Sequence, residues 1–266
     1  PDVLCYFPAG AQRGQTVEVT AIGKFTTWPV GVWTDQPGLE ITPQEKQGLL
    51  SVRVAADARP GLYWIRLHDE SGSAVPHPFV VGTTSELVET EPNNTLDAAQ
   101  RVGEEGTPAT TVLMNGQLKG GGDVDLFSIP AKAGQWLVAD LDANVPLDAP
   151  FDAVMQLISP EGFVQAQNDD HQGLDPRVAF EVPYDGLWQV RLFGFPATPN
   201  STIGFAGDDA YTYRLLLTTG PYVDYTRPMA ISQNVASTVA LQGWNLPAEL
   251  ASVAIAPTAE ADVLLE

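Results

Sequence analysis

Short strand-like runs separated by Gly and Pro are the feature that most constrains the fold of this chain. Its 24 glycines and 22 prolines divide runs rich in Val, Leu, Ile, Thr and aromatic residues. Within these runs apolar residues recur at every second position, so each run presents one buried and one solvent-facing side. Clear examples are residues 16–22, 49–54, 61–67 and 186–192. The sequence therefore predicts an all-β chain of tandem antiparallel β-sandwiches, with one short helical turn over 95–102.

An internal echo at a spacing of 220 residues predicts the domain organisation. Matching residues recur without a gap in the pairs Pro1/Pro221, Val3/Val223, Pro8/Pro228, Val19/Val239 and Gly23/Gly243. The simplest interpretation is two copies of one small β unit on either side of a central domain. We expect an immunoglobulin-like sandwich over 1–82, a jelly-roll-like sandwich over 86–219 and a partial second immunoglobulin-like unit over 221–266. The last unit is expected to be truncated, or completed by a later segment.

The charge balance excludes several partners. With 33 acidic and 13 basic residues, the formal net charge is −20. Such a surface repels nucleic-acid phosphates and anionic membranes, and no apolar run approaches the roughly 18 residues of a membrane span. The balance fits a soluble extracellular protein or the binding of hard cations, with solubility alone as the alternative. Cys5 is the single cysteine, in an apolar run, and is predicted to be a buried, inert thiol.

The middle of the chain carries an ordered series of motifs. They are Glu89–Thr95, the Gly-rich turn 120–129, 131–135, 152–157, 159–162, 168–170, 175–177, 183–188 and 213–215. Over about 130 of the 266 residues this series resembles the bacterial pre-peptidase C-terminal domain, a family related to the collagen-binding domains of clostridial collagenases. The resemblance implies a jelly-roll-like sandwich appended to a secreted or cell-surface protein, where it serves binding, secretion or stability.

The flanking units carry weaker cues. Phe7-Pro8-Ala9-Gly10 with Gly23, and Pro228 with Gly243-Trp244-Asn245, resemble immunoglobulin-like units of the IPT/TIG type. The order of domains resembles that of large secreted proteins of planctomycete-like bacteria.

Acidic residues at the start of the central region predict a cation site. Residues two apart in an extended segment point the same way, so Glu89, Glu91 and Asn93 share one face, and Asp123 and Asp125 share another. Four carboxylates brought together are repulsive without a counter-ion. Calcium takes six to eight oxygen ligands in loose geometry, and the absence of Cys and His from the set disfavours zinc and copper.

The resemblance implies the same metal. In the collagenase relatives, a Glu-x-Glu-x-Asn-Asp segment and Asp residues of the following turn bind calcium. The residues of this chain that match are Glu89, Glu91, Asn93, Asn94, Asp123 and Asp125. Asn94 stands where those relatives have Asp, and the turn is shorter, so the site is expected to be weaker. The alternative is a solvated acidic linker beside an Asp-rich turn. A second oxygen-rich set, Asn168-Asp169-Asp170 with Asp175 and Asp152, is predicted to cap turns.

Signatures of catalysis are missing from the sequence. The three histidines lie apart, and neither a Gly-x-Ser-x-Gly nor a His-Glu-x-x-His motif occurs. We therefore predict a non-enzymatic segment that binds an extracellular polymer, protein or polysaccharide, or other domains of its own chain. Two alternatives stay open. One is a carbohydrate-binding module, for which Trp28 and Trp33 are the best candidates, whereas Trp64, Trp136 and Trp188 are predicted to be core residues. The other is a fragment of a secreted hydrolase or peptidase.

Overall fold

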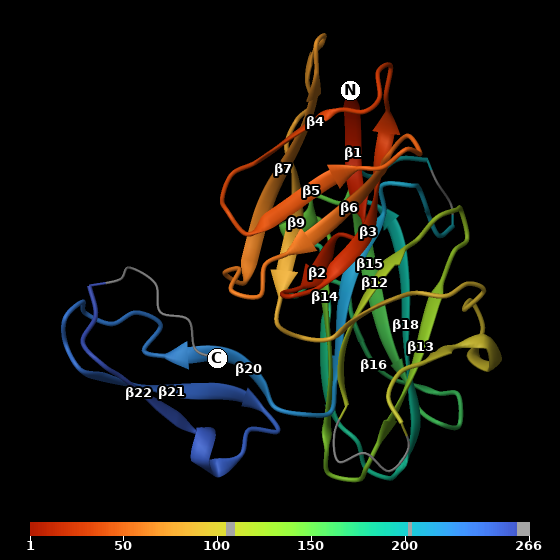
Figure 1. The fold of residues 1–266 in the computed structure, drawn as a ribbon. Coiled ribbons are helices and arrows are strands. Elements are labelled where there is room, and N and C mark those ends of the chain that lie inside the picture. Colours follow the sequence, from red (N-terminus) through yellow and green to blue (C-terminus); the bar gives the residue numbers. More distant parts are fainter. Residues whose placement is uncertain (105–109, 202–203, 260–266) are drawn as a thin grey trace.

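A computed structural model of the chain describes residues 1–104, 110–201 and 204–259. It confirms the all-β prediction, because strands form the framework of every region (Figure 1). The described helical segments are short: the 3-10 turns Leu96–Ala98 and Ala248–Leu250, and the one-turn helix α1 (Asn144–Leu147). The helical turn predicted over 95–102 is therefore confined to three residues, and Thr95 precedes it without a side-chain capping bond. No helix among the described residues is long and apolar enough to cross a membrane.

The N-terminal region is a sandwich of two sheets. One has the order β1 (Asp2–Phe7), β3 (Thr16–Lys24), β6 (Leu49–Val54), β5 (Leu39–Pro43). The other has the order β2 (Gly10–Gln12), β9 (His77–Gly82), β7 (Gly61–Asp69), β4 (Gly31–Thr34), with β8 (Gly72–Ser73) beside β7. Alternate residues of each strand meet between the sheets, where Val19, Leu50, Ile65, Leu67 and Phe79 are fully buried.

The central region is a larger sandwich of two five-stranded sheets. The first has the order β10 (Glu86–Val88), β12 (Thr111–Gln117), β19 (Thr212–Thr218), β14 (Trp136–Asp142), β17 (Arg177–Glu181). The second has the order β11 (Gln100–Arg101), β13 (Asp125–Ala131), β18 (Gly186–Pro196), β15 (Phe151–Ile158), β16 (Val164–Asn168). Their shared core includes Phe127, Phe151, Trp188, Tyr213 and Leu215, each without exposed surface.

The C-terminal region is a three-stranded antiparallel sheet of β20 (Tyr222–Arg227), β21 (Ser237–Trp244) and β22 (Ser252–Ile255). Its first hairpin repeats β1–β3 at the spacing found in the sequence. Val3 pairs with Gly23 and Val223 with Gly243, and both first strands shift register after that pair. Both glycines are required by close approach, because a Cβ would lie 2.1 Å from the Asp2 carbonyl oxygen at Gly23 and 2.0 Å from the Tyr222 carbonyl oxygen at Gly243.

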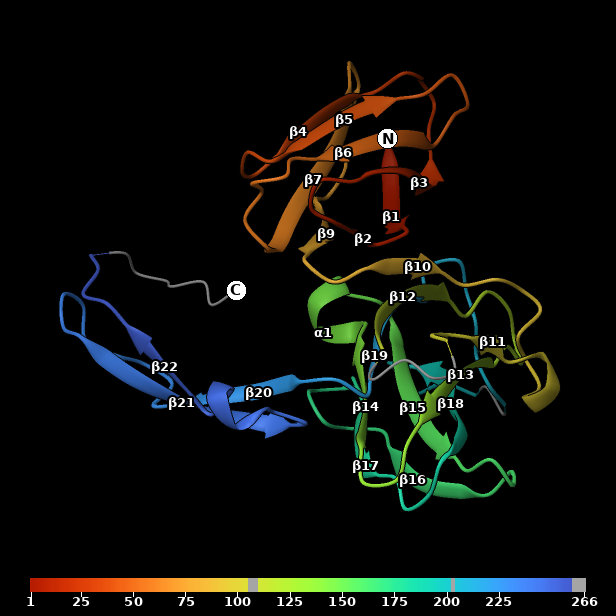
Figure 2. The same cartoon turned by 60° about the horizontal axis from the view of Figure 1, so that its bottom comes forward.

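The C-terminal sheet is bonded to the central sandwich, from which it projects to one side (Figures 1 and 2). Asn245 accepts a hydrogen bond from the Trp136 backbone N–H (2.9 Å) and donates to the carbonyl oxygens of Trp136 (2.7 Å) and Gly220 (3.0 Å). The Arg177 guanidinium reaches Asp140 of the central sandwich (2.7 Å) and Asp224 of β20 (2.6 Å). These contacts cross the short link between β19 and β20.

The N-terminal and central sandwiches meet along β10, which lies between them in Figure 2. A buried ion pair sits at this junction: Arg214 Nη2 lies 2.5 Å from Glu86 Oε1, and their side chains are 2% and 8% exposed. Gly10 of β2 makes room for the guanidinium, because a Cβ there would lie 2.6 Å from Arg214 Nε. Cys5 is buried as predicted, and burial raises the pKa of its thiol to about 12.

The prediction for Trp64 is wrong. It was expected in the core but is 38% exposed, because β7 turns Tyr63, Ile65 and Leu67 toward the facing sheet. Of the two candidates for carbohydrate stacking, Trp28 packs edge-on against Phe25 and donates its indole N–H to the Gln44 carbonyl oxygen at 2.6 Å. Trp33 is 48% exposed, Trp136 is half-buried, and Trp188 is fully buried as predicted.

Candidate metal centre

Three acidic side chains meet at one end of the central sandwich. Glu89 and Glu91 follow β10, and Asp125 opens β13. One carboxylate oxygen from each lies within 4.8 Å of the others. Glu89 is held in place on both sides, because its backbone N–H donates to the Asn115 carbonyl oxygen (2.9 Å) and its Oε1 accepts from the Gln117 N–H (2.8 Å). Asp125 has no exposed surface.

Asn93 joins this cluster through its backbone. Its N–H donates to Glu91 Oε2 at 2.9 Å, and its carbonyl oxygen accepts from the Leu126 N–H at 3.1 Å. The side chain is fully buried, yet neither its Oδ1 nor its Nδ2 has a hydrogen-bond partner among the described residues. Asp125 Oδ1 is also buried without a partner. Buried polar atoms are nearly always satisfied in proteins, so the unpartnered oxygens of Asn93 and Asp125 are exceptional, and each is able to accept a hydrogen bond or bind a cation.

The electrostatics of the cluster point the same way. Burial, and then the Asp125 carboxylate, raise the pKa of Glu89 to about 9. Burial is also the largest cause for Asp125, whose pKa rises to about 7. The raised pKa values mean that burial favours the protonated carboxyl groups, whereas a divalent cation would favour their charged forms.

Tyr213 of β19 completes the cluster, and the sequence interpretation missed its role. Its hydroxyl reaches Asp125 Oδ2 at 2.5 Å and Glu89 Oε2 at 3.1 Å. Gly116, the cross-strand partner of Tyr213, leaves room for the Tyr213 ring and the Glu89 carboxylate, because a Cβ there would lie 2.1 Å from Tyr213 Cζ and 2.6 Å from Glu89 Oε2. The signal was present in the Tyr213-Arg214-Leu215 motif, whose alternation directs Tyr213 and Leu215 inward.

Asn94 and Asp123 have a different place from the other predicted ligands. Asn94 Nδ2 donates to Asp123 Oδ1 at 3.0 Å, and the Asp123 carboxylate also accepts from the backbone N–H groups of Lys119 (2.7 Å) and Val124 (3.0 Å). Asp123 therefore closes the Gly-rich turn and ties it to the segment that carries Asn93. It is not one of the three residues of the acidic cluster.

The second oxygen-rich set caps backbone, as predicted for Asp175. Its buried carboxylate accepts from the N–H groups of Ala143 (3.2 Å), Asn144 (2.6 Å) and Val145 (2.9 Å). Asn168 Oδ1 accepts from the Arg177 N–H at 2.9 Å. These oxygens accept hydrogen bonds from backbone N–H groups of the protein itself.

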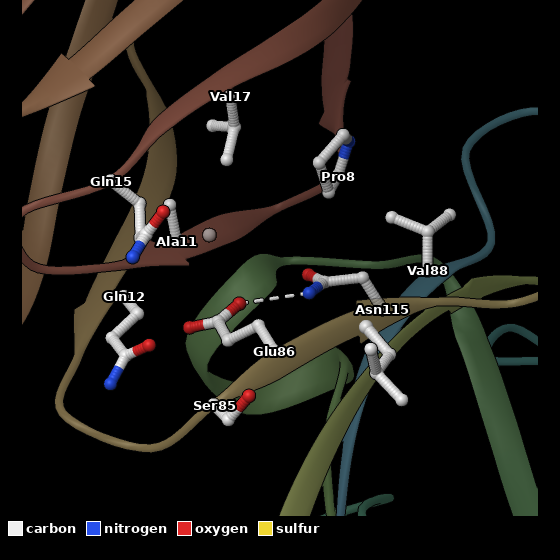
Figure 3. Close-up of a pocket in the computed structure, with 11 residues that line it drawn as sticks. Pro8, Ala11, Gln12, Gln15, Val17, Ser85, Glu86, Val88 and Asn115 are labelled. Carbon is white, nitrogen blue, oxygen red and sulfur yellow. Dashed lines mark hydrogen bonds between the residues drawn. The ribbon is translucent and has the colours of Figure 1, made fainter.

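A hollow of about 260 Å³, lined by polar and apolar residues alike, lies at the junction of the N-terminal and central sandwiches (Figure 3). Gln12, Gln15, Glu86 and Asn115 line it together with Pro8 and Val17. Asn115 donates to Glu86 Oε2 at 2.8 Å, while its own Oδ1 is buried and unpartnered. The hollow adjoins the Glu86–Arg214 pair and so belongs to the contact that joins the two sandwiches.

No protein-family model matches the chain. A probable subtilase-type serine protease of Deinococcus radiodurans is 30% identical over 120 residues, which cover 45% of this chain and 15% of the relative. The chain therefore spans a small part of that protein's length.

Solved structures that match part of the chain include the pre-peptidase C-terminal domain of a collagenase from Bacillus anthracis. It is 15% identical with a TM-score of 0.32, and the match covers 48% of this chain and 99% of that domain. A Bacteroides ovatus protein of a mixed-linkage glucan utilisation locus, solved with a heptasaccharide, is 10% identical with a TM-score of 0.26 and covers 79% of this chain and 72% of that one. The comparisons give no support to the IPT/TIG-type resemblance of the flanking units.

Proposed function

We propose that this chain is a non-catalytic accessory segment of a larger secreted protein, in which a calcium ion stabilises the central sandwich. The ligands in this proposal are Glu89, Glu91, Asn93 and Asp125. The observation that carries it is a cluster of three carboxylates bonded to the backbone of Asn93, whose fully buried amide has no hydrogen-bond partner among the described residues. Asn94 and Asp123 support the site indirectly, because their hydrogen bond holds the ligand segment against the turn.

The donor chemistry favours calcium over other cations. Carboxylate and amide oxygens are hard ligands, and no His or Cys belongs to the cluster. The set comes from a loop and a strand start rather than from a rigid cage, which suits the loose coordination of calcium better than the strict octahedron of magnesium.

The burial of the site supports a structural role over a catalytic one. Asn93 and Asp125 have no exposed surface, so a substrate has little access to the ligands. The site also joins segments far apart in sequence, because Tyr213 reaches both Glu89 and Asp125. A cation here would lock the start of β13 to the segment after β10.

The strand order of the N-terminal sandwich matches the two sheets of immunoglobulin domains, which supports the assignment of residues 1–82 as an immunoglobulin-like sandwich.

Calcium-dependent melting tests the proposal. The protein is stripped with EGTA, dialysed, and melted with and without calcium, and calcium binding is followed by titration calorimetry. Calcium at about 100 times its Kd should add about 2.7 kcal/mol to the free energy of unfolding of the central sandwich. An unchanged melting temperature, with no heat of binding, would exclude the site.

Matched variants locate the binding site. Asn93→Ala and Asp125→Asn should each abolish the calcium-induced rise, whereas Asp97→Asn, an exposed acid nearby in the chain, should leave it intact. Because both site variants relieve the burial of polar or charged groups, they are expected to fold without metal. Loss of the rise in Asp97→Asn as well would place calcium elsewhere on this acidic surface.

A second candidate function, the binding of carbohydrate, is favoured by the two exposed tryptophans of the N-terminal sandwich. A fragment of a secreted peptidase remains the third candidate, since the Deinococcus radiodurans relative is described as a probable protease. Expression of the full-length protein with an assay for peptide hydrolysis distinguishes that candidate from a purely accessory role.

A further inference from the structure

Two tryptophans stand exposed on one outer sheet face of the N-terminal sandwich. Trp33 of β4 is 48% exposed and Trp64 of β7 is 38% exposed. Trp33 lies opposite Arg66 in the β4–β7 ladder, and Trp64 is two residues from Arg66 on the same strand. The three side chains therefore project from the same face, with His68 next along β7. We call Trp33, Trp64, Arg66 and His68 the β4–β7 row.

Arg66 is the unusual member of the row. Its guanidinium carbon lies 5.6 Å from the centre of the Trp33 ring, and its buried Nε has no hydrogen-bond partner among the described residues. It also makes no ion pair with a described carboxylate. By contrast, Arg53, Arg177 and Arg214 are each bonded to an acidic side chain. An unpaired guanidinium over an exposed indole leaves hydrogen-bond donors and apolar surface available together.

The backbone beneath the row is held firmly. Asp35 fixes the end of the β4–β7 pair, because its Oδ1 accepts from the Trp64 N–H (2.9 Å) and its N–H donates to the Trp64 carbonyl oxygen (3.2 Å). At the other end, Gly31 pairs with His68, and the imidazole lies over its backbone where a Cβ would approach within 2.2 Å. The exposed side chains thus project from a rigid surface, which lowers the entropy lost on binding.

We propose that the β4–β7 row is a binding platform for an uncharged polysaccharide. The inference rests on the proposed accessory function and names the polymer to which that segment would attach. Sugar rings stack their apolar faces on the indoles of Trp33 and Trp64, while Arg66 donates hydrogen bonds to ring hydroxyls. His68 lies within the row and offers a further polar group.

The size of the row favours a polysaccharide over a folded protein. A stable protein interface buries about 800 Å² on each partner, with a broad apolar centre. The row is only one strand pair wide, and its apolar surface comes from two rings. A single extended chain of sugar rings fits such a narrow row of exposed aromatic side chains.

The distribution of charge favours an uncharged polymer. Residues 1–82 contain eight acidic and six basic residues, so nearly all of the net charge of −20 lies in the rest of the chain. The N-terminal sandwich thus has no strong field for a charged polymer, and the acidic central sandwich beside it repels a polyanion over about a Debye length of 8 Å. Stacking, which salt does not screen, therefore supplies the affinity.

Affinity electrophoresis of the whole chain tests the platform. The probes are hydroxyethyl cellulose, mixed-linkage glucan and xylan as uncharged polymers, polygalacturonate as an anionic one, and gelatin as a polypeptide. We expect retardation by at least one uncharged polymer, unchanged between about 0.05 and 0.5 M salt because stacking is unscreened. Retardation by polygalacturonate or gelatin alone, or by none of the probes, would overturn the proposal.

Variants assign the binding to the row. Trp33→Ala and Trp64→Ala should each weaken binding about tenfold, their combination should abolish it, and Arg66→Gln should weaken it by about threefold. Phe163→Ala is the control, because Phe163 is a 68% exposed aromatic residue of the central sandwich. Retention of full affinity by the double variant would refute the platform. Should an alanine variant unfold, Trp33→Phe and Trp64→Phe must keep partial binding.

These experiments test the platform and the calcium site independently of each other. The row variants should keep the calcium-induced rise in melting temperature, and Asp125→Asn should keep polysaccharide binding. Loss of polysaccharide binding on treatment with EGTA would contradict a platform built on the N-terminal sandwich alone.

Discussion

The two complete sandwiches of this chain are stabilised by different means. The central sandwich buries polar and charged side chains, among them Asn93, Asp125, Asp175 and Arg214. The N-terminal sandwich buries an apolar core, and its Asp69 side chain, 3% exposed, lies 3.5 Å from the N-terminal ammonium group. Burying a charge is costly unless it is paired, so the central sandwich depends on its partners and on solution conditions. The N-terminal sandwich should depend less on both.

A pH series in EGTA should show the largest contrast. The folded-state pKa values of Glu89 and Asp125 are raised to about 9 and about 7, so the folded state binds more protons than the unfolded state. Without metal, the central sandwich should therefore lose stability as pH rises from about 4 to about 9. Each pKa unit corresponds to about 1.4 kcal/mol. Calorimetry should show one transition that falls with pH and another, from the N-terminal sandwich, that does not fall, because the pKa values of its Asp69 and His77 are lowered in the folded state.

Calcium provides the control for the pH series. The cation should remove most of the downward slope, because it stabilises the ionised carboxylates. Parallel behaviour of both transitions in EGTA would contradict the contrast between the sandwiches.

Removal of one arginine from each sandwich should give the next largest contrast. Arg214→Ala leaves Glu86 buried without its partner, and is expected to cost about 3–5 kcal/mol. Arg53→Ala removes an equally close pair with Glu40, but both side chains are 63% exposed, and the expected cost is about 0–1 kcal/mol. Urea unfolding measures both. Equal losses would show that burial does not determine the value of these ion pairs.

A glycine pair gives the smallest and sharpest contrast, within the central sandwich itself. Gly116→Ala places a methyl group against Tyr213 and Glu89, and should cost about 1–3 kcal/mol and weaken calcium binding. Gly120→Ala is the control, because nothing lies within 4 Å of a Cβ there and its backbone has no positive φ. Calcium affinity unchanged in Gly116→Ala would remove Tyr213 from the description of the site.

Much of the fold was predictable from the sequence because the signals are local. The alternation of apolar and polar residues predicted the strands, and the positions of glycine and proline predicted where the strands end. The echo at 220 residues predicted two copies of a small β unit, and the pairs β1–β3 and β20–β21 have matching registers.

Predictions were least successful where distant strands decide the outcome. The alternation of apolar residues divides β7 into two faces but does not say which face the opposite sheet covers, so Trp64 was predicted to lie in the core. Arg66 and His68 on the same face were the available evidence that it points outward. Glu89, Glu91 and Asp125, three of the predicted ligands, do lie together in one acidic cluster. The use of Asp123 in the Gly-rich turn depends on three-dimensional contacts with Lys119 and Asn94.

The bonds that Asn245 makes across the β19–β20 link have a mechanical consequence. A unit joined by a flexible linker would change its orientation freely, and a force applied to it would reach its neighbour only through the linker. Here Asn245 forms hydrogen bonds with both Trp136 and Gly220, and Arg177 forms an ion pair with Asp224. These contacts fix the orientation of the C-terminal sheet relative to the central sandwich. Tension applied to that sheet passes into the edge of the central sandwich through these side chains. The junction therefore acts as a stiff joint that transmits load and direction along the chain.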